Sequence, residues 1–408
     1  MEELFQEHLE ELRTLGLIGP KHIEIAKRMD RAADELYADE VEFYLRREPN
    51  PEGHRKTLGK YGLLGIQVPQ ANGGLGGDAL ALALAFERLG QVGMGPVTFL
   101  DVQCCLTETI LNRWGNKGQK REYLTPAARG KKIIAYCLTE PEAGSDPASL
   151  STEFEEAKDG YRITGTKYLI TNGSIADAYI VFAYPKGKRE GMSAFLVDRD
   201  EKTVKVDMRL KEKVGLFTSD TTLLEFNRAF SPKENLIGES GRGLHVAYTG
   251  LLSGRVGIAA GCVGVIEDCL NSATERAKSR VQHGKLIGKH QLIQRRIAAI
   301  AEHLETARWP VYAAASWKAK HDLRPDDQEL RKLADHRSTI AKVIATRAAW
   351  EASDHALQVF GGFGYSILSA PGRHYIDVRA TRIYEGADEV LELKIASDVL
   401  GKEFEAYK

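Results

Sequence analysis

The sequence predicts an α+β protein of several domains, because two periodicities alternate along it. Apolar residues recur three and four positions apart before about residue 130 and after about residue 241, which is typical of helices. Between about 133 and 233 the period is two and β-forming residues dominate. A chain of 408 residues also exceeds one ordinary core. We therefore expect an N-terminal α-helical domain at 1–132, a middle β-barrel-like domain at 133–240 and a C-terminal helical bundle at 241–408.

The N-terminal helical pattern is clearest in one apolar stripe, formed by Leu80, Ala81, Ala83, Leu84, Phe86 and Leu89. A loop rich in glycine at 69–77 interrupts the helices. In the middle segment, the short apolar run 133–139 predicts a buried strand. Asp159-Gly160 is expected to form the turn of a β-hairpin between 152–155 and 161–164.

Two long helices are expected after residue 241. The first carries an apolar stripe, formed by Ile293, Ile297, Ile300, Leu304 and Ala307, and we expect it to break at Pro310 because proline lacks the amide donor. The second runs from about 328 to 360, after a polar connection at 321–327.

Composition excludes several classes of protein. The formal net charge is −1, with 43% hydrophobic and 28% charged residues, which argues against a nucleic-acid or membrane surface as the main partner. No stretch approaches the roughly 20 apolar residues of a membrane span, and the acidic N-terminus has no signal core, so we expect a cytoplasmic protein. Five cysteines without a C-x-x-C pair predict buried free thiols and no metal site.

The most informative segment is 136–146, where a β-run opens into a loop of proline, glycine and small hydroxyl residues. Pro141 lacks an amide donor and Gly144 tolerates positive φ, so the loop must turn sharply. Thr139 and Ser145 each offer a donor and an acceptor to a flat polar ring. A structural turn that satisfies its own polar groups is the alternative.

Three other segments could carry chemistry, and each has a plain structural alternative. The glycines of 358–364 could admit another surface, or could only cap a helix. Glu385 could be a desolvated carboxylate with the raised pKa of a general base, or a solvated acid at a helix start. Arg280 could clamp a diphosphate, or end a helix in solvent.

The order and spacing of these motifs closely resemble the acyl-CoA dehydrogenases. The segments that carry the resemblance are YCLTEPEAGSD (136–146), GTKYLITNG (165–173), RVQHGKLIGKHQ (280–291), QVFGG (358–362) and IYEG (383–386). It extends to 62–77, 210–220 and 253–261, and so covers nearly the whole chain. The resemblance implies a helical domain, a β-barrel-like domain and a four-helix bundle, in agreement with the periodicities.

The resemblance also implies FAD in a cleft between the β-domain and the bundle, with its adenosine-diphosphate half reaching a neighbouring subunit. The residues expected to bind it are Tyr136, Leu138, Thr139, Ser145, Leu169, Thr171, Arg280, Gln282, His290, Gln291, Gln358, Gly361, Gly362, Ala387 and Glu389. A homo-oligomer, as a dimer or a dimer of dimers, would follow. An electron-transfer flavoprotein is the expected acceptor.

Glu385 matches the family's catalytic base, which takes the α-proton of an acyl-CoA while the β-hydrogen passes as hydride to flavin N5, giving a trans-2-enoyl-CoA. In a minority of the family the catalytic base occupies the position that is Gly254 in this chain. Glycine cannot act as a base, so this position does not compete with Glu385 for the role. The expected substrate-binding residues are Ser145, Arg255, Tyr384 and Gly386.

Several residues depart from the family pattern, namely Leu169, Phe217, Leu252, His283 and Ile376. They indicate a divergent branch of the family, and they leave the identity of its acyl substrate undetermined. On the segment expected to line the acyl end, Asp101 and Gln103 are interpreted as solvated helix residues, with a role as substrate ligands as the alternative. Two alternatives to the dehydrogenase remain, an oxidase of the same fold that uses O₂ and a non-catalytic scaffold.

Overall fold

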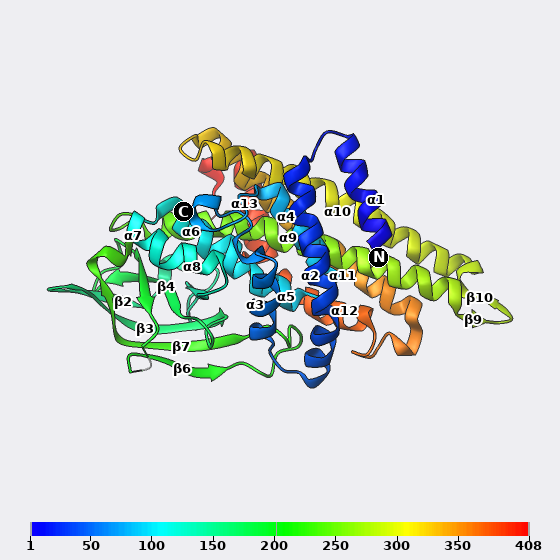
Figure 1. The fold of residues 1–408 in the computed structure, drawn as a ribbon, viewed down its shortest axis with the longest axis horizontal. Helices are drawn as coiled ribbons and strands as arrows, with labels where there is room; N and C mark the ends of the chain where they lie inside the picture. Colours follow the sequence, from blue (N-terminus) through cyan, green and yellow to red (C-terminus); the bar gives the residue numbers. More distant parts are fainter. Residues whose placement is uncertain (1, 201, 407–408) are drawn as a thin grey trace.

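The computed structural model describes residues 2–200 and 202–406, and its N-terminal part is helical (Figure 1). The elements are α1 (Glu2–Thr14), α2 (Pro20–Arg46), α3 (Pro51–Lys60), η1 (Leu63–Gly65), η2 (Gln70–Asn72), α4 (Ala79–Gly90), α5 (Met94–Asp101), η3 (Val102–Thr107), α6 (Glu108–Trp114), α7 (Lys117–Gln119), η4 (Lys120–Leu124) and α8 (Thr125–Ala128). Asp78 caps α4 by accepting hydrogen bonds from the amides of Leu80 and Ala81 at 3.0 and 2.9 Å. Helix α5 passes into α6 through the π-helical turn η3, a distortion that is frequent at functional sites.

The middle segment folds into a sheet. Its elements are β1 (Ile134–Cys137), η5 (Pro147–Ser149), β2 (Glu153–Ala157), β3 (Gly160–Thr171), β4 (Ala178–Pro185), β5 (Ser193–Asp198), β6 (Val204–Arg209), β7 (Thr221–Pro232), η6 (Lys233–Asn235) and β8 (Leu236–Ile237). Among the described residues the strand order is β6-β7-β3-β2-β4-β5-β8, with β1 parallel to β4. The predicted hairpin is confirmed as β2–β3. Its turn lies at Lys158-Asp159, one residue earlier than predicted, because Gly160 already pairs with Ala157.

Long helices form the C-terminal part. They are α9 (Gly243–Ser279), α10 (Gln291–Leu323), α11 (Gln328–Phe360), α12 (Ala370–Thr381) and α13 (Asp388–Leu400), with the short elements β9 (Val281–Gln282), β10 (Lys285–Leu286), η7 (Ile287–Lys289), η8 (Gly361–Phe363) and η9 (Lys402–Phe404). The helix predicted at 328–360 is confirmed. The predicted break at Pro310 is wrong, because α10 continues through it. The buried neighbours Ala307 and Val311 pack in the core on either side, and this packing offsets the one lost hydrogen bond.

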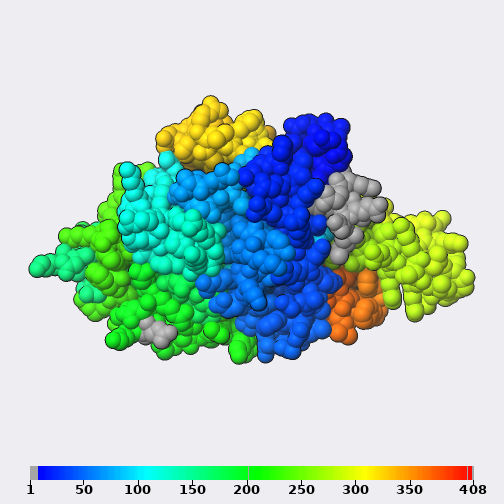
Figure 2. Space-filling model, viewed as in Figure 1, coloured from blue at the N-terminus to red at the C-terminus, as the bar shows by residue number. Residues whose placement is uncertain are grey.

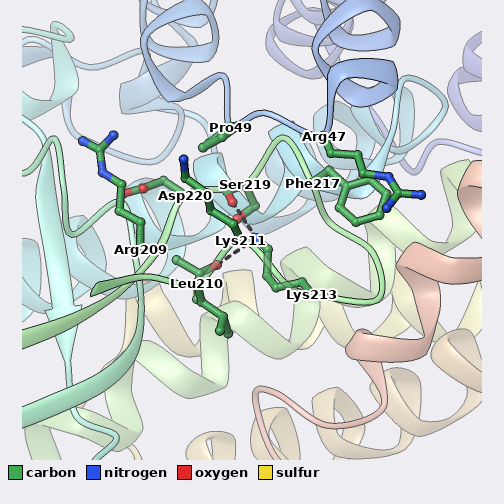
Figure 3. Close-up of a pocket in the computed structure, with 10 residues that line it drawn as sticks. Arg47, Pro49, Arg209, Leu210, Lys211, Lys213, Phe217, Ser219 and Asp220 are labelled. Carbon is green, nitrogen blue, oxygen red and sulfur yellow. Dashed lines mark hydrogen bonds between the residues drawn. The ribbon is translucent and has the colours of Figure 1, made fainter. Parts of the chain in front are cut away.

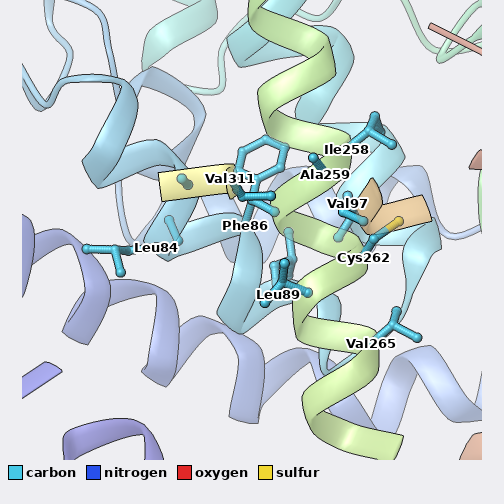
Figure 4. Close-up of a cluster of buried hydrophobic side chains, with 14 of the residues drawn as sticks. Leu84, Phe86, Leu89, Val97, Ile258, Ala259, Cys262, Val265 and Val311 are labelled. Atoms are coloured by element: carbon cyan, nitrogen blue, oxygen red, sulfur yellow. The ribbon is translucent and has the colours of Figure 1, made fainter. Parts of the chain in front are cut away.

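Helix α9 is the centre of the core, and apolar side chains of α4, α5 and α10 meet it (Figure 4). Glycines allow α4 and α9 to touch along their backbones. A Cβ at Gly90 would lie 2.1 Å from the carbonyl oxygen of Gly261, and a Cβ at Gly264 would lie 1.9 Å from that of Glu87. Among the described residues, α9 is also the one helix long and apolar enough to cross a membrane, but 89% of its apolar window is buried, as in a core helix.

The face shown in Figure 2 has the N-terminal helices at its centre, the β-rich segment at one end and the end of the α9–α10 pair at the other. All five cysteines are free and buried, as predicted.

Candidate active site

A buried ion pair holds the two segments predicted to contact the flavin ring. Glu140 accepts hydrogen bonds from the amide and hydroxyl of Ser151, from the amide and hydroxyl of Thr152, and from Lys167 Nζ at 2.8 Å. Lys167 Nζ also donates to the carbonyl oxygen of Leu138 at 3.1 Å. Burial alone would raise the pKa of Glu140, but the Lys167 charge and the hydrogen bonds outweigh it and lower that pKa to about 2. The loop after β1 is therefore fixed to β3.

Leu169 stands out from β3 at a bulge. The pairing of β3 with β7 shifts register between Lys167 and Ile170, and Leu169 has a φ of 57° and a side chain that is 47% exposed. The amide of Tyr168 donates to the carbonyl oxygen of Thr139 at 2.9 Å, so the two segments lie side by side. A β-bulge re-aims a side chain next to active sites. Here it exposes an apolar side chain on the segment that pairs with the backbone of Thr139, which suits a flat ring with a polar edge.

The remaining predicted flavin ligands range from exposed to buried. Ser145, Arg280, Gln282, Gln291, Gln358, Gly361, Gly362 and Glu389 are exposed, Tyr136, Thr139, Thr171, His290 and Ala387 are half-buried, and Leu138 is buried. A Cβ added at Gly144, Gly361 or Gly362 would meet no described atom within 4 Å. These surfaces have room for a cofactor.

Within one chain the predicted flavin ligands form two separate groups. Figure 1 shows the β9–β10 hairpin, which follows Arg280 and carries Gln282, at the opposite end of the molecule from β3. The end of α11, with Gln358, belongs to the hairpin's group, because Arg276 of α9 stacks on Phe360 at 5.5 Å. A single chain therefore does not bring the ring-side and diphosphate-side residues together.

Glu385 lies in a strained turn between α12 and α13. Its φ is 57°, and Gly386 follows with a φ of 105°. Two cations anchor the turn by its backbone, since Arg255 Nε donates to the carbonyl oxygen of Glu385 at 3.4 Å and Lys342 Nζ donates to that of Gly386 at 2.8 Å. Among the described residues, the backbone N–H of Glu385 has no acceptor. The turn therefore presents both a carboxylate and a free amide.

The Glu385 carboxylate occupies space that Gly254 leaves on α9. A Cβ at Gly254 would fall 2.2 Å from Glu385 Oε2 and 2.6 Å from Oε1, closer than real Cβ atoms come. Burial raises the pKa of Glu385 to about 7, although a hydrogen bond from Asp101 and the charges of Arg255 and Lys342 oppose the rise. This is the environment of a base that works near neutral pH, and it differs from that of a solvated helix-start acid.

The interpretation of Asp101 and Gln103 as solvated residues is wrong. Asp101 is 2% exposed and Gln103 is fully buried. The Gln103 amide bonds both backbone groups of Ile134, at 2.8 and 3.3 Å, and so ties α5–η3 to β1. Asp101 lies at the junction of α5 and η3, beside Glu385. Its position between Phe99-Leu100 and Val102 was the signal that could have identified it as buried.

The four predicted substrate residues lie in different settings. Arg255 is buried and bonds Asp335 at 2.8 Å and Thr339 at 3.1 Å, besides holding the Glu385 turn. Tyr384 and Gly386 flank Glu385, and both are half-buried. Ser145 is exposed on the loop after β1. Their contact with substrate stays a prediction.

A small hollow near Phe217 is lined by Arg47, Pro49, Arg209, Leu210, Lys211, Lys213, Phe217, Ser219, Asp220 and Thr221 (Figure 3). Its cavity volume of about 10 Å³ is roughly what one water molecule needs. Phe217, one of the departures from the family pattern, packs on Tyr44 at 5.0 Å and under Arg47 at 5.3 Å. The hollow is too small for a cofactor.

Comparison with known families gives three matches in chain order. They are the acyl-CoA dehydrogenase N-terminal domain at residues 19–131, its middle domain at 135–229 and its C-terminal domain at 241–400. The chain belongs to the acyl-CoA dehydrogenase family. The predictions of family and fold are thereby confirmed, and members of this family are FAD-containing oxidoreductases.

Individual members of the acyl-CoA dehydrogenase family match most of the chain. An acyl-CoA dehydrogenase of Bacillus subtilis is 37% identical over 348 residues, which are 85% of this chain and 89% of that protein. The structure of butyryl-CoA dehydrogenase from Megasphaera elsdenii has a TM-score of 0.88 at 32% identity and covers 94% of this chain and 99% of that one. A glutaryl-CoA dehydrogenase from Mycobacterium smegmatis in complex with FADH2 has a TM-score of 0.88 at 26% identity, with 98% and 99% covered.

Proposed function

We propose that this acyl-CoA dehydrogenase desaturates an acyl-CoA between Cα and Cβ to a trans-2-enoyl-CoA, with Glu385 as the base that removes the α-proton. One observation carries the proposal: Glu385 is half-buried, its Oε2 is enclosed in the space left by Gly254, and burial raises its pKa to about 7. A base is most effective when its pKa lies near the working pH. An acyl chain placed against this carboxylate would exclude water from it.

The turn that carries Glu385 also supplies part of the stabilisation that the reaction needs. The α-proton of a thioester is far less acidic than a carboxylic acid, so the enolate oxygen must be stabilised as charge develops. The free backbone N–H of Glu385 is a preorganised donor for that oxygen, and such donors contribute roughly 3–4 kcal/mol each. Arg255 and Lys342 hold this amide in place through the adjacent carbonyl groups. FAD, when bound, supplies the hydride acceptor.

The flavin ring would lie along the segments fixed by the Glu140–Lys167 pair, between Thr139 and the bulge at Leu169. The diphosphate side, from Arg280 to Gln291 and from Gln358 to Gly362, would serve the cofactor of a neighbouring subunit, since one chain separates the two groups. A dimer or a dimer of dimers completes the site. An electron-transfer flavoprotein would take the electrons. Relatives named for short-chain and butyryl-CoA substrates make short acyl-CoA esters the first to test.

The test is Glu385→Gln in the FAD-loaded enzyme, with Glu392→Gln on exposed α13 surface as the matched control. We expect the Glu385 variant to keep FAD and to lose about 10²- to 10⁴-fold or more in the rate of anaerobic flavin bleaching by acyl-CoA. The Glu392 variant should bleach at the wild-type rate. Wild-type bleaching in the Glu385 variant would reject the base. Rapid hydrogen peroxide production by the wild-type enzyme without an acceptor would assign an oxidase instead.

A further inference from the structure

The carboxyl groups of Asp101 and Glu385 both pack against a face of α9 that carries only glycines at the points of contact. Gly254 and Gly257 are three residues apart, so they lie on the same face of the helix, about one turn from each other. A Cβ at Gly254 would fall 2.2 Å from Glu385 Oε2, and a Cβ at Gly257 would fall 2.5 Å from Asp101 Oδ1. The two carboxyl groups, 284 positions apart in the sequence (385 minus 101), therefore rest beside each other on surface that only glycine leaves open.

One oxygen of each carboxyl group lacks a hydrogen-bond donor among the described residues. Asp101 Oδ1 and Glu385 Oε2 are both enclosed, and neither has a hydrogen-bond partner among the described residues. Two adjacent carboxylates at this depth would repel each other in addition to losing their hydration. A single proton between them removes both costs, because a carboxylic acid donates the hydrogen bond that the neighbouring carboxylate lacks.

The surroundings decide which of the two holds the proton. Arg255 and Lys342 lie near Glu385 and favour its charged form. The groups around Asp101 are either neutral or negatively charged, so none of them stabilises its carboxylate. Burial raises the pKa of Asp101 far above the usual range. The titratable and charged groups that face the pair from the packed elements are Tyr136 of β1, Cys104 and Cys105 of η3, Arg255 of α9, Lys342 of α11, and Tyr384.

We propose that Asp101 is the protonated partner of Glu385, and that its carboxylic O–H donates a hydrogen bond to the Glu385 carboxylate and holds it against α9 before substrate binds. This inference rests on the proposed role of Glu385 as the base. Asp101 is then a positioning residue, which keeps Glu385 ionised at a pH where burial alone would protonate it. The proton of Asp101 stays on Asp101 throughout, while Glu385 accepts the α-proton of the substrate.

The first test compares Asp101→Asn, which can still donate, with Asp101→Leu, which has nearly the same size and cannot. The readout is the acidic limb of kcat/KM against pH, which reports the base in the free enzyme. We expect Asp101→Leu to move this limb up by about one to two pH units, the effect of losing one hydrogen bond to a charged acceptor. Asp101→Asn should leave it within a few tenths. A limb that moves down in both variants would show that Asp101 is ionised, and an unmoved limb in both would give it a merely structural role; either result overturns the inference.

A second measurement does not depend on turnover. Burial also raises the pKa of Glu108, so infrared difference spectra of the holoenzyme at pH 8 should contain its carbonyl stretch in every variant and, besides it, the band of a second buried carboxylic acid. We expect this band to disappear in Asp101→Asn and to persist in Glu385→Gln. The reverse pattern would place the proton on Glu385 and overturn the inference. If the band persists in Glu385→Gln but that variant still reduces flavin, the proton assignment to Asp101 stands and the proposed base fails, so the two failures are distinguishable.

Discussion

Glu140 and Glu385 have the same carboxylate side chain, but their environments shift its pKa in opposite directions. Glu140 is surrounded by donors and by the buried Lys167, so its pKa falls to about 2 although burial opposes the fall. Glu385 lies between a glycine face and another carboxyl group, so burial raises its pKa to about 7. Their charges at neutral pH are fixed by their neighbours and not by their type.

The difference teaches how the two tasks are divided. Glu140 must stay ionised because it holds the loop after β1, and four hydrogen bonds from Ser151 and Thr152 secure it. Glu385 must gain and lose a proton, so the structure anchors its backbone through Arg255 and Lys342 and leaves its carboxylate with few donors. Satisfied carboxylates support a fold, and under-satisfied ones are suited to proton transfer.

Of the substitutions that test this difference between Glu140 and Glu385, Lys167→Met should have the largest effect on stability. It would leave Glu140 buried without its cation, and we expect a loss of about 3–5 kcal/mol in the free energy of unfolding, with weaker retention of FAD. Urea denaturation at pH 7 measures this loss. The added change Glu140→Gln should recover part of it, because no unpaired charge then remains.

The matched control is Lys186→Met, which breaks the exposed pair with Glu155 and should change little. Equal destabilisation by the Lys167 and Lys186 variants would mean that the buried pair is not what holds the loop.

Gly254→Ala should displace the carboxylate of Glu385. The added Cβ would fall 2.2 Å from Glu385 Oε2, so the carboxylate must move, and a misplacement of about 1 Å costs roughly 100-fold in rate. We expect kcat/KM to fall by about that factor while FAD content stays normal, since alanine suits a helix. Steady-state kinetics measure the first quantity and flavin absorbance the second.

Gly250→Ala, one turn earlier on α9, is the control for Gly254→Ala. Its Cβ would meet Ile110 and Leu106 at 3.2 Å and no carboxylate. If it lowered kcat/KM as much as Gly254→Ala, distortion of the helix and not displacement of Glu385 would be the cause.

A smaller, pH-dependent effect should appear in the stability of Glu385→Gln. The folded pKa of about 7 lies above the ordinary 4.5, so the wild-type protein loses stability as pH rises from 4.5 to 7, and the uncharged amide does not. Without substrate, the variant should match the wild type near pH 5 and exceed it by about 1–3 kcal/mol at pH 8. Thermal unfolding at both pH values checks this. A gain that is equal at pH 5 and pH 8 would contradict a raised pKa.

Local patterns predicted most of the fold and part of the site. The helix at 328–360, the strand after Ile133 and the hairpin before Gly160 follow from residue periodicity and turn chemistry, which act over a few positions. The break at Pro310 was wrong, because tertiary packing on both sides outweighed a local preference. Asp101 was misassigned because its burial depends on α9, which lies far along the chain.

The sequence by itself determined the family, the order of helical and β segments, and the position of Glu385 in a turn before a helix. These are properties of short motifs and of their spacing. Only the tertiary structure decided the chemical state of each carboxyl group. The space at Gly254, the pairing of Asp101 with Glu385 and the pairing of Glu140 with Lys167 all join residues distant in the chain. A pKa depends on hydration and on charges within a few ångströms, and folding alone brings these together.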